Sequence, residues 1–382
     1  MKTILITGAR GFVGRNLSAM WTARGDWSIL GAEIDTPEEQ WRAHLARADV
    51  VVHLAGVNRP QSESEFEPGN VGPAEELCRR LDALDRRPLV LVSSSIQAEL
   101  DNPYGRAKRR MEETLIRWAE RSGAPLRIYR LKNVFGKWCR PNYNSVVATF
   151  CHNIAHDLPI TINDPARIVD LVYIDDVAAA FAAEIEAGGL SAEPYAAIDA
   201  VPATPISLSE LAGRIQFFRQ MQQSLRVPDF AQRFNQQLYA TFLSYLPVER
   251  WEYGLEIKSD QRGNLAEFIK SPWFGQIFVS RTLPGITRGN HYHHTKTEKF
   301  LVLAGEGLIR FRHIEDSSGC EIREHRVRGE DYRVVEIPPG WTHSITNVGN
   351  GEMITLFWSS ELFDPDRPDT YFLPVDPPTA VE

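Results

Sequence analysis

A tyrosine and a lysine four residues apart, Tyr104 and Lys108, follow a run of serines that ends at Ser95. Residues i and i+4 of a helix share one face, so the phenol and the ammonium can point into the same site. A neighbouring ammonium favours the phenolate, which predicts a Tyr104 pKa closer to the range useful for general acid and base chemistry. The alternative is a surface tyrosine beside a solvated lysine, but lysine is rare here, with eight among 42 basic residues.

Three glycines are spaced three residues apart in TGARGFVG, residues 7–14, between the apolar stretch Ile4–Ile6 and a helical pattern. Glycines at a strand-to-helix turn let the backbone approach a pyrophosphate, which then lies at the helix N-terminus. A later strand end, HLAG at residues 53–56, belongs at the same edge of a parallel sheet. These motifs predict a dinucleotide site, and its expected cofactor-binding residues are Gly8, Arg10, Gly11, Phe12, Val13, Gly14, Leu54, Ala55, Gly56, Tyr104 and Lys108.

The residues alone leave the type of nicotinamide cofactor open. An acidic side chain about 20 positions beyond the glycine loop binds the ribose 2′-hydroxyl of NAD, and Glu33 or Asp35 can serve. Either of them can equally be a solvated carboxylate. Arg10, within the loop, is instead suited to the 2′-phosphate of NADP.

The last third of the chain contains three histidines and a glutamate at spacings that suit a metal site: His291, His293, Glu298 and His343. Residues 291 and 293 of a strand face the same way, and the other two can converge on them from neighbouring strands. Three imidazoles and one carboxylate suit a divalent transition metal with an open coordination position. A single histidine such as His313 is more often an exposed or hydrogen-bonded side chain.

The elements that must position the first site alternate between strands and helices. Continuous apolar strands separated by helices indicate a parallel sheet covered on both faces. The expected strands are Ile4–Ile6, Val50–Leu54, Leu89–Val92 and Leu126–Tyr129, and the expected helices are Asn16–Arg24, Ala74–Asp82 and Lys108–Ala119. Residues 206–246 are predicted to be helical.

From about residue 255 the chain becomes a series of short apolar runs separated by turn signals, which predicts an all-β sandwich or barrel. These runs are Gln276–Arg281, Lys299–Leu303, Leu308–His313, Arg333–Ile337 and Met353–Phe357. Arg310 and Arg312 share one strand face and suit either an exposed edge or a diphosphate. The end of the chain from Phe363 is expected to be an irregular tail. We expect two domains, 1–247 and 251–382.

Length and charge exclude several classes of protein. The 382 residues are enough for two domains, and 42 basic against 50 acidic side chains give a net charge of -8. Such a chain lacks the basic footprint of a protein that binds nucleic acid or an anionic membrane. The longest apolar stretch, Val177–Ala187, contains two glutamates and does not suit a membrane span. Four scattered cysteines without a CxxC pair predict reduced thiols in a cytoplasmic protein.

The motifs TGARGFVG, HLAG, SSS and YGRAK, with NVFG at 133–136 and YIDDVA at 173–178, resemble the extended short-chain dehydrogenase/reductases that act on sugar nucleotides. This resemblance implies a Rossmann-like doubly wound parallel sheet and a catalytic set of Ser95, Tyr104 and Lys108, with Ser94 as the competing hydroxyl. Tyr104 is then the acid and base, and Lys108 is its pKa partner and ribose ligand. The resemblance also favours NADPH, with NADH as the other choice.

The spacing of the four candidate metal ligands resembles the two cupin motifs, except that Tyr332 stands where a glycine is expected and Gly329 lies three residues earlier. The resemblance implies a C-terminal cupin β-barrel with a divalent metal, expected to be zinc. The order of the two domains, with the segments NVFGKWCRPNYNSV, GNHYHHTKTEKFLV and FDPDRPDTYFL, resembles the CapF-type bifunctional enzymes of capsular polysaccharide biosynthesis.

That resemblance implies a cytoplasmic homodimer that makes a precursor of UDP-N-acetyl-L-fucosamine for capsule or O-antigen. The cupin would invert C-3 of a UDP-2-acetamido-2,6-dideoxy-4-ketohexose, and the reductase domain would then reduce the C-4 ketone to give UDP-2-acetamido-2,6-dideoxy-L-talose. The candidates for the epimerising base are His294, Lys299, Asp331 and Tyr332. Two alternatives stay open: a cupin that is only a binding or dimerisation module, and a cupin that is a metal-dependent oxygenase.

Overall fold

The computed structural model describes residues 1–188, 196–198, 201–316, 318 and 321–377. Internal contacts divide the chain into two compact units. The first unit comprises Met1–Phe217 and Arg233–Val248, and the second comprises Phe218–Gln232 and Glu249–Glu382. The domain limits 1–247 and 251–382 stay a prediction about which segments fold independently.

The first unit is built on a six-stranded sheet in which all neighbouring strands are parallel. In order across the sheet, its strands are β2 (Trp27–Ala32), β1 (Lys2–Thr7), β3 (Val50–His53), β4 (Leu89–Ser95), β5 (Leu126–Leu131) and β8 (Ala196–Ile198). The four strands expected from the sequence are present at the centre of this sheet. The parallel sheet is therefore confirmed.

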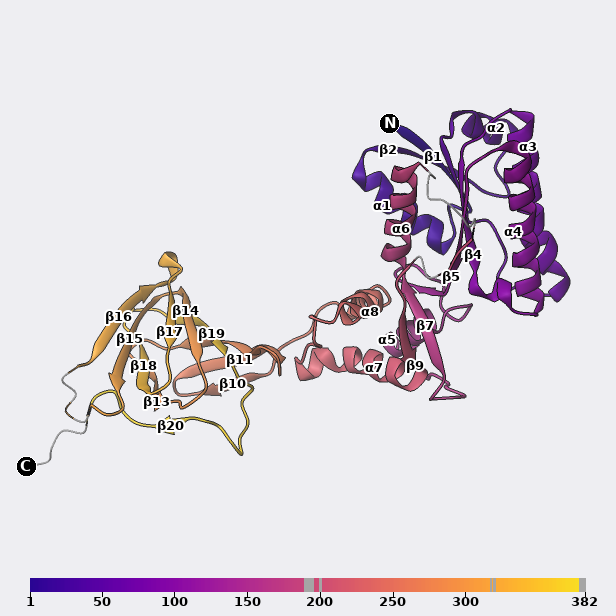
Figure 1. Cartoon of the computed structure of the whole chain (residues 1–382). Helices are drawn as coiled ribbons and strands as arrows, with labels where there is room; N and C mark the ends of the chain where they lie inside the picture. Colours follow the sequence, from indigo (N-terminus) through magenta and orange to yellow (C-terminus); the bar gives the residue numbers. More distant parts are fainter. Residues whose placement is uncertain (189–195, 199–200, 317, 319–320, 378–382) are drawn as a thin grey trace, which may run out of the picture. The chain divides into compact units, whose positions relative to one another are not determined.

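Helices cover both faces of this sheet, as Figure 1 shows for α1 and α6 on one side and α3 and α4 on the other. The covering helices are α1 (Phe12–Arg24), α2 (Glu38–Arg47), α3 (Phe66–Ala83), α4 (Pro103–Ser122) and α6 (Ile174–Ala187). Strand β1 supplies both cores, because Ile4 and Ile6 pack into one and Leu5 into the other. The doubly wound architecture is confirmed.

Helix α4, which carries both Tyr104 and Lys108, begins at a well-defined cap. The Asn102 side chain accepts a hydrogen bond of 2.8 Å from the Gly105 N–H, and Pro103 occupies the first turn, where a missing N–H costs nothing. The helix ends at Gly123 in the left-handed conformation, with φ of 72°. The observed helix is therefore longer at both ends than the predicted helix, 108–119.

The remaining elements of the first part of the chain lie beside the main sheet. They are the mixed sheet β6 (Asn133–Phe135), β7 (Ile168–Tyr173) and β9 (Thr204–Ser207), and the helices α5 (Val146–Ala155), α7 (Leu208–Ser224) and α8 (Arg233–Leu243). The prediction of continuous helix over 206–246 is wrong between α7 and α8. Leu225 has a φ of 59°, and its carbonyl accepts a 2.8 Å hydrogen bond from the Lys270 N–H, so the chain leaves the helix to pair with a strand.

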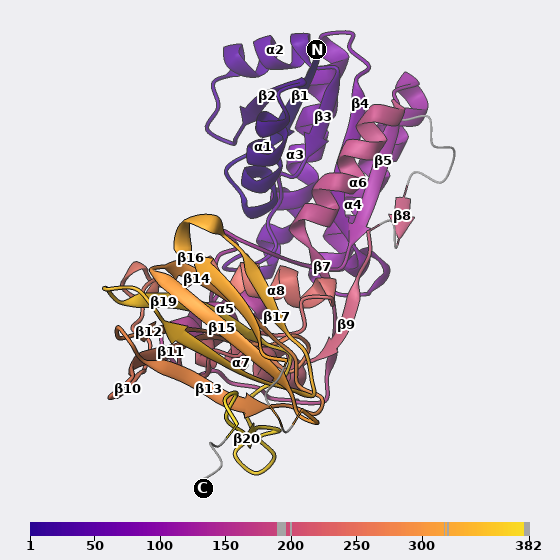
Figure 2. The same cartoon turned by 90° about the vertical axis from the view of Figure 1, so that its left-hand side faces the viewer.

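The second unit consists of two antiparallel sheets over one apolar core, and its strands can be followed in Figure 2. One sheet has the order β10 (Ile257–Asp260), β11 (Gly263–Ser271), β12 (Gly275–Thr282), β19 (Met353–Ser359), β14 (Glu298–Ala304) and β17 (Val334–Ile337). The other has the order β16 (Arg323–Arg328), β15 (Glu306–His313), β18 (Trp341–Asn347), β13 (Thr287–Tyr292) and β20 (Tyr371–Phe372). The all-β expectation for this unit is confirmed.

The prediction of an exposed edge for Arg310 and Arg312 is wrong. Strand β15 lies between β16 and β18 rather than at an edge, and Arg312 is only 3% exposed because its guanidinium donates to the carbonyls of Pro374 and Val375 at 2.7 and 2.8 Å. Arg310 forms an ion pair of 2.7 Å with Asp376. Both arginines therefore hold residues 374–376 against the unit. The segment from Phe363 is irregular as expected, apart from the short strand β20.

None of the helices in the described ranges combines the length and the apolar character needed to cross a membrane. Cys78, Cys139 and Cys151 are free thiols. Cys320 lies outside the described residues.

Candidate functional site

The glycine loop between β1 and α1 forms a tight turn that depends on its glycines. Gly8 has a φ of +69°, and its N–H donates to the Ala32 carbonyl at 2.8 Å, which ties the loop to β2. A Cβ on Gly14 would lie only 2.4 Å from the Gly8 carbonyl oxygen. The first turn of α1 can approach the loop this closely only because Gly14 has no side chain. The helix N-terminus thus lies against the loop, as a pyrophosphate site requires.

A cavity of about 840 Å³ extends from this loop to the end of β4 and the start of α4. Ser95, Tyr104 and Lys108 all line it, and so do the predicted cofactor residues with one exception. The exception is Ala55, whose backbone N–H donates to the Thr7 hydroxyl at 3.2 Å and helps hold the ends of β1 and β3 together. The predicted residues of the first site therefore meet around one cavity, although they come from distant parts of the sequence.

Arg10, Glu33 and Asp35 form one charged cluster beside the loop. The Arg10 guanidinium lies 2.5 Å from Asp35, and the Arg10 backbone N–H donates to Glu33 at 2.5 Å. The hydrogen bond with Asp35 raises the pKa of Arg10, and the same contact lowers the pKa of Asp35. The two carboxylates that could select NAD are thus paired with the cation that could select NADP.

The two serines at the end of β4 have different partners. Successive residues of a strand face opposite ways, and the buried Ser94 donates a short hydrogen bond to the Glu112 carboxylate. The Ser95 hydroxyl accepts from the Gln97 N–H at 3.2 Å, and it also hydrogen-bonds the Tyr104 phenol. Ser95 is therefore the serine in contact with Tyr104.

Burial raises the pKa of Tyr104, and the hydrogen bond with Ser95 offsets only part of that effect. The expected decrease is therefore wrong for this structure, in which the Lys108 ammonium instead donates to the Ser93 carbonyl at 3.0 Å. Lys108 is 6% exposed, and burial lowers its pKa to about 8. A phenol that keeps its proton at neutral pH suits a proton donor better than a base.

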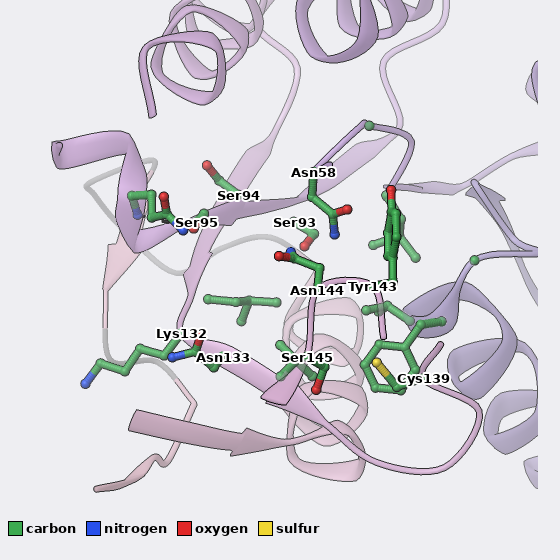
Figure 3. A pocket seen from close by; sticks show the side chains of 18 of the residues that line it. Asn58, Ser93, Ser94, Ser95, Lys132, Asn133, Cys139, Tyr143, Asn144 and Ser145 are labelled. Atoms are coloured by element: carbon green, nitrogen blue, oxygen red, sulfur yellow. Dashed lines mark hydrogen bonds between the residues drawn. The ribbon is translucent and has the colours of Figure 1, made fainter. Parts of the chain in front are cut away.

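The far wall of the cavity was largely missed by reasoning from the sequence. Figure 3 shows side chains from this wall, many of which come from the segment that follows β5. The polar lining side chains labelled there, apart from the serines of β4, are Asn58, Lys132, Asn133, Cys139, Tyr143, Asn144 and Ser145. They lack a regular spacing, and the only available signal was the family resemblance of NVFGKWCRPNYNSV.

The four predicted metal ligands of the second unit converge. One ligand atom from each of His291, His293, Glu298 and His343 lies within 4.8 Å of the other three. His291 on β13 is the direct cross-strand partner of His343 on β18, next to a β-bulge at Asn290. Bulges commonly redirect side chains beside functional sites. We call these four residues the metal group.

The donor atoms of the metal group fit a cation. The Nε2 atoms of His293 and His343 are buried without a hydrogen-bond partner, and they lie 3.4 and 3.6 Å from one Glu298 oxygen. Burial would raise the pKa of Glu298, but the two histidines beside it outweigh burial and hold that pKa well below its usual range. Burial, reinforced by His343, lowers the pKa of His291 to about 4. The group thus offers a neutral His291 imidazole, a carboxylate and two further imidazoles with unpartnered Nε2 atoms, and imidazole and carboxylate are ligands of divalent metals.

A segment near the end of the chain supports the metal group. The Asp369 carbonyl accepts a 2.6 Å hydrogen bond from His293 Nδ1, which leaves Nε2 free for a metal. The Asp369 carboxylate accepts from the backbone N–H groups of His294, Thr295 and Lys296 at 3.0, 2.9 and 2.8 Å. Asp369 therefore binds the loop that carries His293 in four places, and the sequence contained no signal for this role.

Three residues of the metal group, His291, His293 and Glu298, line a cavity of about 240 Å³. None of the four suggested epimerising bases lines it. Lys299 faces away from Glu298 on β14 and pairs with Glu336, and Tyr332 is 75% exposed. Asp331 lies with Tyr332 at the opposite end of β14 from Glu298, and the exposed His294 packs on Tyr371. The titratable side chains that line the cavity, apart from the metal group, are Lys258, Glu267, Lys296 and Glu361.

Tyr332, which replaces the expected glycine, has a φ of 49° and thus takes the left-handed conformation that glycine favours. Close packing falls instead to Gly329, where a Cβ would lie 2.6 Å from the Ala304 Cα. In the turn before β17, Tyr332 therefore takes the left-handed conformation and Gly329 allows the close packing. A single glycine could do both.

Comparisons with known proteins agree with this two-part organisation. The model of the NAD dependent epimerase/dehydratase family matches residues 4–195, and the model of the polysaccharide biosynthesis C-terminal domain matches residues 258–371. The Bordetella bronchiseptica enzyme WbmF, solved in complex with NAD+, shares the fold with a TM-score of 0.53 at 18% identity, over 64% of this chain and 92% of that chain.

Two relatives match nearly the whole chain. A UDP-2-acetamido-2,6-beta-L-arabino-hexul-4-ose reductase from Pseudomonas aeruginosa is 43% identical over 368 residues, which cover 96% of this chain and 97% of the relative. The crystal structure of the capsular polysaccharide assembling protein CapF from Staphylococcus aureus is 44% identical, with a TM-score of 0.87, over 97% of this chain and 99% of that chain. The chain therefore belongs to the CapF family of capsular polysaccharide proteins, in which an NAD-dependent epimerase/dehydratase domain precedes a polysaccharide biosynthesis C-terminal domain.

Proposed function

We propose that this protein is a bifunctional nucleotide-sugar enzyme. Its second unit inverts C-3 of a UDP-2-acetamido-2,6-dideoxy-4-ketohexose, and its first unit reduces the C-4 ketone with NADPH to give UDP-2-acetamido-2,6-dideoxy-L-talose. The observation that carries the proposal is the single cavity of about 840 Å³ lined by both the glycine loop and Tyr104. The Pseudomonas relative is a UDP-hexulose reductase, which supports the substrate class.

The side chains around this cavity have distinct roles in the proposed reduction. A bound nicotinamide supplies the hydride that reduces the carbonyl carbon. Tyr104 donates the proton that the carbonyl oxygen needs, and its half-buried phenol holds that proton at neutral pH. Ser95, in contact with Tyr104, orients the same oxygen. Lys108 supplies the positive charge that stabilises the phenolate left after proton transfer.

The proposed preference for NADPH rests on Arg10. Replacing Arg10 by alanine removes the cation for the 2′-phosphate and leaves Glu33 and Asp35 to repel it. We expect the KM for NADPH to rise about 10-fold or more, because the charge-assisted contact with the 2′-phosphate is lost. The KM for NADH should change little, since its free 2′-hydroxyl can donate to either carboxylate. Steady-state kinetics with both cofactors measure the ratio of the KM for NADPH to the KM for NADH.

Arg24→Ala is the matched control for this prediction. Arg24 is also an arginine of the first unit with two carboxylate partners, Asp26 and Glu186, but it lies outside the large cavity. Removal of the Arg24 side chain should leave the ratio of the KM for NADPH to the KM for NADH unchanged. Equal losses with both cofactors in Arg10→Ala would contradict the assignment.

The proposed epimerisation takes place at the metal group, which we assign to a cupin barrel with zinc as the metal. A C-4 ketone acidifies the hydrogen at C-3, so removal of that hydrogen and protonation from the other face invert the centre. A divalent metal held by His291, His293, Glu298 and His343 would supply Lewis acidity for this chemistry. The buried, unpartnered Nε2 atoms of two of these histidines support the assignment.

Incubation of the protein with the UDP-ketosugar in deuterated water tests the proposal. Without NADPH, the second unit should introduce deuterium at C-3 while the ketone persists. With NADPH, the ketone should disappear, and the product stereochemistry can be read by NMR. Reduction without exchange at C-3 would favour a cupin that is only a binding or dimerisation module. Oxygen uptake with redox-active iron in the metal group would favour the oxygenase.

Asp369 offers a test of metal binding that does not depend on activity. Asp369→Asn removes the charge that holds the three backbone N–H groups, so the support of His293 should loosen. We expect the affinity for zinc to fall about 10- to 100-fold, as is typical when a residue that supports a metal ligand is lost. Competition with a chelator of known affinity measures it. Asp366→Asn, at an exposed aspartate of the same segment, should have no effect, and an equal loss in both variants would refute the role.

The cytoplasmic location and the homodimer remain proposals. Light scattering of the purified protein at several concentrations measures the oligomeric state. A constant mass equal to one chain would exclude the homodimer.

A further inference from the structure

A buried carboxylate lies directly behind Lys108 in the first unit. Glu112 is one turn further along α4 and only 2% exposed. The Ser94 hydroxyl of β4 donates to one of its oxygens. Arg130 of β5 binds both oxygens, with Nε 3.1 Å from Oε1 and Nη2 2.6 Å from Oε2. Glu112 thus connects the helix that carries Tyr104 to two strands of the sheet.

A bidentate arginine compensates the charge of this carboxylate, and a serine satisfies a further lone pair. Lys108, in contrast, has neutral hydrogen-bond partners. Its ammonium donates to the Ser93 carbonyl at 3.0 Å and lies 3.6 Å from Met111 Sδ. Burial lowers the pKa of Lys108 to about 8, and the charge of Glu112 acts in the opposite direction. The charge on Lys108 at neutral pH therefore depends on Glu112.

The other titratable groups around Lys108 do not replace Glu112. On β3, burial and then the Lys108 charge lower the pKa of His53 to about 3, so this imidazole is neutral. On β5, Arg130 forms ion pairs with both Glu112 and Glu99, so its positive charge is shared between them. Glu99 belongs to the 3₁₀ turn after β4 and lies 3.1 Å from Arg130. On α4 itself, Tyr104 retains its proton.

We propose that Glu112 is a positioning residue of the reductase site, whose carboxylate keeps Lys108 charged and holds α4 in register with β4 and β5. The spacing Tyr-x-x-x-Lys-x-x-x-Glu places the three side chains in successive turns of one helix face. Glu112 does not touch the cavity, and it acts on the reaction through Lys108. The inference rests on the proposed reductase function, and it concerns a residue outside the predicted catalytic set.

Glu112→Gln tests this role, because the amide keeps the size and the hydrogen-bonding capacity but not the charge. We expect the pKa of Lys108 to fall by about one unit or more. Reduction requires charged Lys108, so kcat/KM falls as the pH rises through that pKa. The alkaline limb of the pH profile should therefore move to lower pH. For a shift of one unit, reduction should be nearly unchanged at pH 6 and about fivefold slower at pH 8.

A second measurement needs no substrate and so separates this inference from the proposed function. The chain has only eight lysines, so the titration of Lys108 can be followed by NMR with [ε-13C]lysine and assigned by loss of its signal in Lys108→Arg. Glu113→Gln is the matched control, since Glu113 is the next residue of α4 and 52% exposed beside Arg117. It should change neither the titration nor the pH profile.

The outcomes are distinct. A lowered Lys108 titration in Glu112→Gln without any ketosugar reduction by the wild type would support the inference about Glu112 and refute the proposed function. An unchanged Lys108 titration, or an equal loss of activity at every pH, would overturn the inference. If Glu112→Gln does not fold, Glu112→Asp is the substitute. It keeps the charge, so its alkaline limb should stay in place even if kcat is lower, and a displaced limb would overturn the role of charge.

Discussion

Tyr104→Phe is expected to lower kcat for reduction of the UDP-ketosugar by about 10²- to 10⁴-fold, the usual contribution of a positioned general acid. Hydride transfer to C-4 leaves negative charge on the oxygen, and phenylalanine has no proton to neutralise it. The phenol is half-buried in the wall of the large cavity and hydrogen-bonded to Ser95. Loss of NADPH absorbance measures the rate, and a fluorescence titration measures NADPH affinity, which should change little.

Tyr129→Phe is the control for this prediction. It removes a phenol hydroxyl from the same unit, but Tyr129 packs on Phe181 in the core and does not line the cavity. Its rate of reduction should remain within a fewfold of the wild type. Wild-type NADPH oxidation by Tyr104→Phe would refute the assignment of the acid. A Tyr104→Phe variant that cannot bind NADPH would instead indicate a role in cofactor binding.

His343→Ala is expected to abolish exchange at C-3 and to lower metal affinity by at least about 100-fold, more than the loss of a supporting residue costs. His343 is fully buried, and it faces His291 across two paired strands, so no exposed side chain can take its place. Metal content by elemental analysis and deuterium at C-3 by NMR are the two measurements. NADPH oxidation with an already epimerised ketosugar should persist, since the residues proposed for reduction belong to the first unit.

His313→Gln is the control for the metal group. His313 lies on β15 against the Trp341 ring and is 42% exposed, outside the group. It should retain both the metal and the exchange at C-3. Normal exchange by a metal-free His343→Ala protein would show that the chemistry does not need the metal. Loss of NADPH oxidation as well as exchange would show that the variant has damaged more than its own site.

Much of both sites could be predicted because their signals are local. The glycine loop lies within eight residues, and the turn that it forms follows from the missing side chains of Gly8 and Gly14. The pairing of Tyr104 with Lys108 follows from the helix period. The spacing of the metal ligands also identified all four of them, although β13 ends at Tyr292 and His293 lies in the loop that Asp369 holds.

Other features depend on neighbours that are distant in the sequence. Ser94 and Ser95 have different partners because Glu112, which lies 18 residues beyond Ser94, accepts the Ser94 hydroxyl. Strand β13 was expected only at the histidines and not among the apolar runs, because its sequence, TRGNHY, is polar and its positions are only partly buried or exposed. The segment from Phe363 is irregular as expected except at β20, but its contacts could not be predicted because Asp369 meets its partners across about 75 residues.

The sequence by itself determined that this chain joins a dinucleotide-binding parallel sheet to a β unit with a histidine-rich metal group, and that Lys108 is the unusual lysine at the first site. Spacing suffices for these conclusions because helix and strand periods are properties of the backbone. Only the tertiary structure decided the charge states. Burial raises the pKa of Tyr104 where spacing alone predicted a decrease, and it makes Lys108 depend on Glu112. The physical reason is that desolvation depends on everything packed around a group, which no spacing along the chain contains.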